Sequence, residues 1–554
     1  MPRGYGKLAG VSSPPAGLDE AANVADLVRA HRATRPDSTA IVDDANGVYL
    51  SWAELDAAVD GLARGLSVAG LVAGQRVAFA LGNSPAFVVT YLAVARAGLV
   101  SVPMNPRSAT GEIARMLADS GARMVVADSS TVSSVRAAVD GLADALQAAD
   151  DQRRARTPVP LVVVDGVPVL PGERRFADLS LSGGGAGTVL SPVDPENLAL
   201  LLYTSGTSGQ PRGVMLSSRA LLANISQVAS IAPAPTRGDD VVLGVLPLFH
   251  VYGLNAVLGQ VLTCGATLVL AEQFDVEATL QLIVERSVTN VPVAPPVIAA
   301  WAGRAGAAEA LAGVRVLLSG AAPLDPELAA LMTRTSGVPV EQGYGLTEAA
   351  PVVTSTLTSG ARAAGRSPDP AGVGGPLPGV ELEVRDATGA STDEPGQIWV
   401  RGSNLFSGYW PDGADGPTAD GWWGTGDIGL LDADGDLILV DRLRELVLVS
   451  GFNVYPSEIE AVIAEVPGVA EVAVIGVPDA RTGEAAVAYL VADGADRSDD
   501  SIEERVLTHC RTRLARYKQP REVSVVQGLP HSATGKVAKG RLRAQARRAL
   551  LGLQ

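Results

Sequence analysis

Apolar runs of strand length that alternate with helical stretches limit the fold of this 554-residue chain more than any other feature. Residues 77–81 and 99–103 are such runs, and a helical stretch at 86–97 lies between them. A second helical stretch at 110–120 leads to another apolar run at 124–127. Because parallel strands require a crossover that is usually a helix, the pattern predicts an α/β fold with a parallel sheet.

The pattern changes after Asp441, where a smaller module of helices and strands follows. Pro456 begins one helix, and the apolar residues after it recur at helical spacing on one face. We therefore expect a large N-terminal domain of stacked α/β subdomains at 1–440. A small, mobile C-terminal α+β domain would occupy 441–554.

Charge and hydropathy argue against several classes of protein. The net charge of −16 and the isoelectric point near 4.8 disfavour a nucleic-acid binder, which needs a basic surface. Residues 241–271 lack Asp, Glu, Lys and Arg, but Pro247 and several glycines divide them into pieces that suit buried strands and turns better than a membrane span. Cys264 and Cys510 are too few for a disulfide framework, and residues 1–17 lack the apolar core of a signal peptide. We expect a cytoplasmic protein without an integral membrane segment, and peripheral membrane association is left open.

A loop rich in Gly, Ser and Thr follows the apolar run at 198–202. It reads Tyr203-Thr204-Ser205-Gly206-Thr207-Ser208-Gly209-Gln210-Pro211-Arg212-Gly213. Glycines let backbone N–H groups converge on an anion, hydroxyls add donors and a cation balances the charge, which is typical of phosphate binding. A plain Gly/Ser linker is the other interpretation, because the loop lacks the Gly-Lys-Ser/Thr ending of nucleotide-triphosphatase loops.

Motifs downstream favour the phosphate-binding interpretation. In chain order they are Ser319-Gly320-Ala321-Ala322-Pro323-Leu324, Tyr344-Gly345-Leu346-Thr347-Glu348, Gly426-Asp427, Asp441-Arg442-Leu443-Arg444-Glu445 and Gly535-Lys536. Together with the loop, this series resembles the adenylate-forming superfamily, which contains acyl-CoA synthetases, peptide-synthetase adenylation domains and firefly luciferase. The motifs follow the family order over nearly the whole chain.

The resemblance implies that the chain binds ATP. The residues matched to the nucleotide site are Thr204, Ser205, Gly206, Thr207, Ser208, Gly209, Arg212, Gly320, Ala321, Ala322, Tyr344, Gly345, Asp427 and Arg442. In this assignment the loop holds the β- and γ-phosphates, Tyr344 stacks on adenine, and Asp427 binds the ribose with help from Arg442. The chain departs from the family at Arg212, where Lys is usual, and at Gly424, where His is commoner.

The resemblance also assigns the residues that act on the phosphates. Glu348 resembles the Mg²⁺ ligand, and Thr347 would hydrogen-bond the α-phosphate. Lys536 resembles the catalytic lysine that neutralises charge as pyrophosphate leaves. Only four of the 44 Lys and Arg residues are lysines, so a lysine kept inside a motif is expected to be held by its chemistry.

Three further residues are matched to substrate selection and to the second half-reaction. Arg444 resembles the hinge about which the C-terminal domain rotates, and Gly451 would line the channel for the thiol of CoA. His250 lies in a segment that resembles the gate beside the acyl site, where amino-acid-activating relatives carry Asp. We therefore expect an acid without an α-amino group, with a fatty acid as the first candidate and an aryl acid as the second.

The sequence thus predicts an acyl-CoA synthetase that uses ATP, Mg²⁺ and CoA to activate a small carboxylic acid. Residues 349–373 leave no room for the insertion that resembles fatty acyl-AMP ligases, which favours CoA over a carrier protein as the acceptor. An enzyme that loads a carrier protein is the second hypothesis, and a catalytically silent adenylate-binding protein is the third. The chain length of the acid, the pathway and the oligomeric state are left open.

Overall fold

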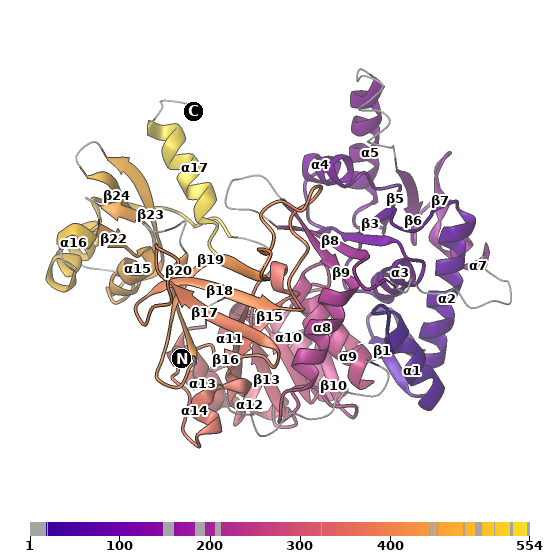
Figure 1. Ribbon diagram of the computed structural model, residues 1–554, viewed down its shortest axis with the longest axis horizontal. Coiled ribbons are helices and arrows are strands. Elements are labelled where there is room, and N and C mark those ends of the chain that lie inside the picture. Colours follow the sequence, from indigo (N-terminus) through magenta and orange to yellow (C-terminus); the bar gives the residue numbers. More distant parts are fainter. Residues whose placement is uncertain are drawn as a thin grey trace. The chain divides into compact units, whose positions relative to one another are not determined.

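Figure 1 shows the computed structural model of the chain. The structure describes residues 18, 20–147, 160–182, 194–204, 212–322, 324–442, 445, 447–449, 452–479, 482–493, 501–514, 516–531 and 536–550. They form two compact units. The first unit runs to Thr204 and continues through Arg212–Glu381 and Arg401–Trp423, and the second comprises Leu382–Val400 and the chain from Gly424 onward.

One sheet of the first unit contains the predicted crossovers. Its strand order among the described residues is β7-β6-β5-β3-β4-β8-β9, and all neighbours pair in parallel except β8 with β9. The strands are β3 (Arg76–Ala80), β4 (Val100–Pro103), β5 (Met124–Ala127), β6 (Leu161–Val164), β7 (Arg174–Arg175), β8 (Leu198–Thr204) and β9 (Arg212–Ser217). The helices of this region are α1 (Asp26–Thr34), α2 (Trp52–Val68), α3 (Pro85–Arg96), α4 (Thr110–Ser120), α5 (Val132–Gln147) and α7 (Phe176–Ser182).

Local signals explain why the first helices begin and end where they do. The Ser84 side chain accepts a hydrogen bond from the backbone N–H of Phe87 and so caps α3, while Pro85 occupies its first turn. Helix α4 ends at Gly121, which has a φ of 60° that glycine adopts without steric cost. Buried Ile113 and Leu117 of α4 then pack into the core beside the sheet. The predicted bounds of α4 and β5 are confirmed.

The second sheet of the first unit has the order β16-β15-β14-β13-β12-β10-β11-β1-β2 within the described part of the chain. Its strands are β1 (Thr39–Asp43), β2 (Val48–Ser51), β10 (Val241–Gly244), β11 (Thr267–Leu270), β12 (Asn290–Val293), β13 (Val316–Ser319), β14 (Val340–Gly345), β15 (Val352–Ser355) and β16 (Gly375–Pro376). Between and after these strands lie α8 (Ser218–Ala229), the π-helix η1 (Tyr252–Leu258), α9 (Gly259–Cys264), α10 (Val276–Glu285), α11 (Pro295–Trp301), α12 (Ala307–Ala310), α13 (Pro326–Ser336), the 3-10 turns η2 (Thr347–Ala349) and η3 (Thr356–Thr358), and α14 (Gly360–Ala363). Strands β10 to β14 pair in parallel, which places the ends of β13 and β14 at one edge of the sheet.

The second unit contains most of a four-stranded sheet and a separate sheet near the C-terminus. The four-stranded sheet has the order β17 (Val380–Arg385), β18 (Gly396–Gly402), β19 (Trp422–Leu431) and β20 (Leu437–Arg442). The other sheet is built from β22 (Phe452–Val454), β21 (Val447–Val449), β24 (Gly483–Ala492) and β23 (Val469–Asp479), with β25 (Glu522–Val525) paired to β24. Helices α15 (Pro456–Ala464), α16 (Ile502–Arg513) and α17 (Lys539–Leu550) and the turn η4 (Arg516–Lys518) complete this unit. Ile459 and Ile463 of α15 are buried, as the helical spacing predicts.

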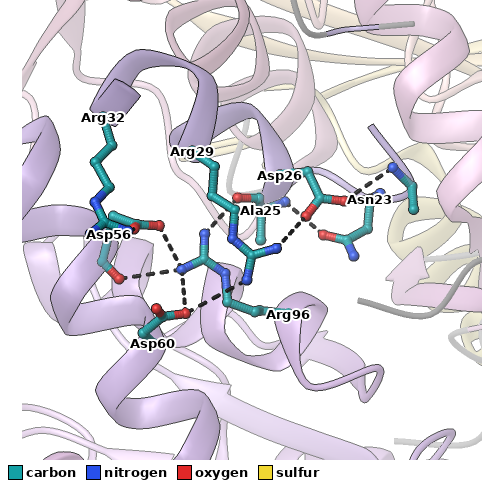
Figure 2. Close-up of polar contacts among 9 residues, drawn as sticks. Asn23, Ala25, Asp26, Arg29, Arg32, Asp56, Asp60 and Arg96 are labelled. Atoms are coloured by element: carbon teal, nitrogen blue, oxygen red, sulfur yellow. Dashed lines mark hydrogen bonds and ion pairs between the residues drawn. The ribbon is translucent and has the colours of Figure 1, made fainter. Parts of the chain in front are cut away.

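A buried arginine joins three helices of the first unit (Figure 2). Arg96, at the end of α3, is fully buried, and its Nη1 lies 2.7 Å from Asp56 Oδ1 and 2.9 Å from Asp60 Oδ1, both on α2. Its Nη2 donates to the carbonyl oxygen of Ala25, directly before α1, at 2.8 Å. Arg32 of α1 lies 3.0 Å from Asp56 Oδ2, so the same carboxylate contacts a buried and an exposed cation.

The fold class is confirmed: the chain has a large N-terminal α/β domain followed by a smaller C-terminal domain. Among the described residues, no helix is both long enough and apolar enough to cross a bilayer. The segment 241–271 forms β10, η1, α9 and β11 instead. The boundary at 441 and the mobility of the C-terminal domain remain predictions.

Candidate functional site

The ends of the predicted phosphate loop lie on two paired strands. Thr204 ends β8 and Arg212 begins β9, and the two residues face each other in the antiparallel register. Tyr203 fixes the end of β8 because its hydroxyl donates to Asp119 Oδ2 at 2.6 Å, and burial together with Asp119 raises the pKa of this phenol. The five predicted loop residues between the strands, Ser205, Gly206, Thr207, Ser208 and Gly209, lie outside the described residues.

The backbone of the turn that carries Thr347 and Glu348 is held from distant parts of the first unit. The backbone N–H of Phe406 donates to the carbonyl oxygen of Glu348 at 2.9 Å. Asn404 Nδ2 donates to Ala349 O at 2.8 Å, and buried Asn255 of η1 donates to the next carbonyl at 2.6 Å. These bonds fix η2, and with it the direction in which the Glu348 side chain leaves the backbone.

Tyr409 connects Glu348 to the phosphate-loop strand. Its hydroxyl donates to Glu348 Oε1 at 2.7 Å. The guanidinium carbon of Arg212 lies 3.6 Å from the centroid of the Tyr409 ring, and Arg212 Nη2 lies 2.7 Å from Asp415 Oδ2. The structure therefore brings together two residues that the sequence assigns to the phosphates, Arg212 and Glu348, through a third residue that the sequence analysis missed.

The residues after β13 that are predicted to bind the nucleotide include one with a left-handed backbone. Ala321 has a φ of 70°, a left-handed conformation that costs a non-glycine residue about 1–2 kcal/mol. Ala322 follows it and is half-buried. A Cβ atom on Gly320 would lie 2.9 Å from the Tyr252 ring, so any larger residue would force this ring to shift. Strain of this kind is commonly kept at functional sites.

Tyr344 lies on β14, opposite Thr354 of β15, and only 7% of it is exposed. Its backbone N–H donates to Thr354 Oγ1 at 3.3 Å. A Cβ atom on Gly345 would lie 2.1 Å from the carbonyl oxygen of Pro351, so close contact between neighbouring backbones requires this glycine. The stacking of Tyr344 on adenine remains a prediction.

His250 lies two residues before the π-helix η1, a kind of helix that is frequent at functional sites. The ring centroids of His250 and Phe249 are 4.7 Å apart at an interplanar angle of 40°. Tyr252 follows two residues later, and burial raises the pKa of its phenol. Aromatic side chains thus flank His250 in sequence, and one of them packs against Gly320.

The predicted ribose-binding residues lie in the second unit. Asp427 on β19 pairs with Arg442 on β20, so the two backbones face each other, although the Arg442 side chain lies outside the described part. Their role in binding ribose remains a prediction. The backbone N–H of Asp427 donates to Thr425 Oγ1 at 3.1 Å. A Cβ atom on Gly424 would lie 2.7 Å from the Gln397 amide and 3.1 Å from the Trp399 ring, so a side chain here would crowd both residues.

Lys536 is half-buried and lies in the second unit, directly before the isolated bridge between His531 and Val537. Arg444 and Gly451, the predicted hinge and CoA-channel residues, fall outside the described residues. The candidate residues therefore divide between the two units, with Thr204 to Glu348 in the first and Asp427, Arg442 and Lys536 in the second.

The donor chemistry near Glu348 suits Mg²⁺ bound together with a nucleotide. Within the described ranges, no three His, Cys, Asp or Glu side chains are grouped so that they could hold a metal ion by themselves. Mg²⁺ is usually bound by one or two carboxylates plus substrate phosphates. A single oriented carboxylate beside the phosphate-loop strand fits that pattern, and Glu348 and Thr347 are the residues that would meet the metal and the nucleotide.

The sequence analysis missed Tyr409, Asn404 and Asn255. All three are polar residues whose partners lie far away in the chain, and no local pattern indicates them. One signal was available: Asn404 and Tyr409 lie in 402–416, a stretch rich in Gly, Asp and aromatic residues between two strands. Such loops often carry functional residues.

Comparisons with known proteins confirm the family resemblance. The model of the AMP-binding enzyme family matches residues 28–410, and the model of the AMP-binding enzyme C-terminal domain matches 458–536. The chain is 35% identical to 4-coumarate–CoA ligase 5 of Oryza sativa subsp. japonica, over 94% of each chain. It is 32% identical to the long-chain-fatty-acid–CoA ligase FadD13 of Mycobacterium tuberculosis, over 94% of this chain and 98% of that protein. The crystal structure of ATP-bound MatB from Rhodopseudomonas palustris aligns with a TM-score of 0.82 at 30% identity, over 95% of this chain and 99% of that one.

Proposed function

This chain belongs to the AMP-binding enzyme family as an AMP-forming acid–CoA ligase, and we propose that it activates an aryl-substituted acid without an α-amino group. The observation that carries the proposal is the pair of aromatic residues, Phe249 and Tyr252, that flank His250 in sequence. The Phe249 ring contacts the His250 ring at a tilted angle, and the Tyr252 ring lies against Gly320. Flat aromatic surfaces suit a planar acid, because offset and edge-to-face ring contacts add to the burial of apolar area.

In the first half-reaction, the carboxylate of the acid attacks the α-phosphorus of ATP, and pyrophosphate leaves. The acid is already ionised at neutral pH, so positioning and charge neutralisation carry the rate enhancement and no general base is needed. Arg212 and the loop that follows Thr204 bind the outer phosphates, and Thr347 donates to the α-phosphate. Glu348 is the carboxylate that would hold Mg²⁺, which when bound would supply positive charge to the phosphates.

By the same resemblance, three residues of the second unit are assigned to this half-reaction. Asp427 orients the ribose, with Arg442 opposite it in the β19–β20 pair. Lys536 neutralises charge that develops at the α-phosphate as the bond to pyrophosphate breaks. In the second half-reaction the thiolate of CoA attacks the acyl carbon of the adenylate, the thioester bond forms, and AMP leaves. Rotation about Arg444 and entry of the thiol past Gly451 belong to this step.

A fatty acid is the second candidate substrate, and a specific observation favours it. The 32% identity to FadD13 covers almost the whole of both chains and is close to the identity with the 4-coumarate ligase. Both classes of acid therefore have to be tested as substrates.

The test measures pyrophosphate release and CoA thioester formation separately, with planar aryl acids and with saturated fatty acids of graded length. We expect the highest kcat/KM with an aryl acid. Gly320→Ala would push the Tyr252 ring, and we expect it to lower kcat/KM for aryl acids by about tenfold or more. A preference for long-chain acids would overturn the substrate assignment, and discharge of the adenylate by a carrier protein but not by CoA would overturn the acceptor.

A further inference from the structure

We propose that Tyr409 is a positioning residue for the Mg²⁺–nucleotide complex, because its hydroxyl orients the Glu348 carboxylate while its ring supports Arg212. The proposal rests on the proposed function, in which Glu348 meets the metal and Arg212 meets the phosphates. Tyr409 lies in the loop before β19, whereas Arg212 lies on the phosphate-loop strand and Glu348 lies in the η2 turn.

The contacts of Tyr409 reach both partners at once. The phenol donates a hydrogen bond to Glu348 Oε1 at 2.7 Å, and the ring face lies 3.6 Å from the guanidinium carbon of Arg212. A cation within about 6 Å of a ring centroid is attracted by the ring quadrupole. One side chain therefore fixes a carboxylate through its hydroxyl and a cation through its face.

The loop that carries Tyr409 is held on the phosphate-loop strand by its backbone. Tyr409 forms an isolated bridge with Val214, and the backbone N–H of Trp410 donates to the carbonyl oxygen of Gly213 at 2.7 Å. The Trp410 indole N–H donates to Asp119 O at 2.9 Å, at the end of α4. The position of the phenol is therefore set by the same strand that carries Arg212.

Packing restricts the ring as well as the backbone. Phe406 meets Tyr409 edge to face with centroids 5.1 Å apart, and the backbone N–H of Phe406 donates to Glu348 O at 2.9 Å. The Glu348 residue thus receives one hydrogen bond at its backbone and another at its carboxylate from a single short segment, 406–409. A residue that is already held by two hydrogen bonds loses little conformational entropy when a ligand binds to it.

The hydrogen bond from Tyr409 restricts the rotation of the Glu348 carboxylate. A hydrogen bond to one oxygen of a ligating carboxylate fixes its rotation, and outer partners of this kind are worth about 10–100-fold in metal affinity or activity. A neutral phenol serves this purpose well, because it donates without adding a charge that would compete with the metal. Loss of the hydroxyl should therefore weaken the binding of the metal with the nucleotide more than the binding of the acid.

The experiment compares Tyr409→Phe with the unchanged enzyme. Binding of Mn²⁺ in the presence of a non-hydrolysable ATP analogue is followed by electron paramagnetic resonance, and the Mg²⁺ dependence of ATP–pyrophosphate exchange is measured in parallel. We expect both the Mn²⁺ dissociation constant and the half-saturating Mg²⁺ concentration to rise by about tenfold, with an unchanged KM for the acid. Phe keeps the ring, so the contact with Arg212 and the packing on Phe406 survive, and thermal unfolding verifies that the variant folds.

The chain offers a matched control. The Tyr49 hydroxyl donates to Asp44 Oδ1 at 2.7 Å, and Arg286 lies over its ring at 5.3 Å, so this exposed residue repeats the arrangement of cation, ring and carboxylate. Tyr49→Phe should leave both metal measurements unchanged. An unchanged metal dependence in Tyr409→Phe, or an equal shift in both variants, would overturn the proposal. If the unchanged enzyme shows no exchange with any acid, the proposed function fails instead.

Discussion

Buried His31 packs against Trp52 with ring centroids 4.7 Å apart, and its Nε2 lies 3.2 Å from the carbonyl oxygen of Thr263. Burial lowers the pKa of this imidazole, and nearby Arg35 lowers it further. The folded chain therefore binds the proton less readily than the unfolded chain, whose histidine has its ordinary pKa of about 6.5. Below that pH the unfolded state takes up a proton that the folded state does not, so protonation favours unfolding.

We expect the free energy of unfolding to fall as the pH drops below about 6.5, with His31 contributing at most about 1.4 kcal/mol per pH unit. His31→Gln removes this titration while it keeps a neutral polar group. Urea unfolding of both proteins between about pH 7.5 and about pH 5.5 checks the prediction. The variant should lose stability less steeply than the unchanged protein, and parallel curves would show that His31 does not contribute.

Residues that the sequence identified differ in kind from those that it missed. Arg212 and Glu348 lie in short motifs whose spacing is set by one strand or one turn, so a single stretch of chain predicts them. Tyr409 and Asn404 act on that turn from more than fifty positions away, and their partners depend on how the loop after β18 packs. A sequence pattern reports local spacing, whereas these contacts exist only in the folded chain.

The same distinction applies to whole elements. The bounds of α4 and β5 follow from a left-handed glycine and a buried apolar run, both of which are local signals. The π-helix η1 had no such signal. It holds buried Asn255, which donates to the carbonyl oxygens of Leu221 and Ala350, so contacts with α8 and the η2 region accompany its unusual backbone.

Helices α1, α2 and α3 are joined by an ion cluster whose centre is fully buried (Figure 2). Arg96→Met would remove the cation that lies within 2.7 Å of Asp56 and 2.9 Å of Asp60. Because two carboxylates would then lose their main buried partner, we expect a loss of about 3–5 kcal/mol in the free energy of unfolding. Urea unfolding measures this loss, and we expect the m-value to stay unchanged.

Arg32 supplies the control for this element, because it contacts the same Asp56 carboxylate at 3.0 Å but has a side chain that is 58% exposed. Arg32→Met should cost less than about 1 kcal/mol, as exposed ion pairs usually do. Equal losses of unfolding free energy in the two variants would mean that the burial of Arg96 does not strengthen its hold on the three helices.

At the scale of the whole molecule, the candidate residues are shared between two compact units. The phosphate-loop strands, the η2 turn and Tyr409 belong to the first, and Asp427, Arg442 and Lys536 belong to the second. The sequence predicted this division in part, because the helix at Pro456 and its apolar face mark a separate module. Which side chains of each unit lie close together depends on tertiary packing, which neither composition nor spacing contains.

Lys536 of the second unit is assigned to adenylate formation alone, so one substitution at this residue should separate the two half-reactions. Lys536→Ala removes the cation proposed to act at the α-phosphate, so adenylate formation should fall by about 10²–10³-fold. Thioester formation from supplied acyl-adenylate should be largely spared, because pyrophosphate has already left. Lys518→Ala is the matched control, since that lysine lies in the same unit and pairs with Glu458 at 2.6 Å. Single-turnover measurements of pyrophosphate and thioester follow each step, and an equal loss in both would contradict a role for Lys536 confined to adenylation.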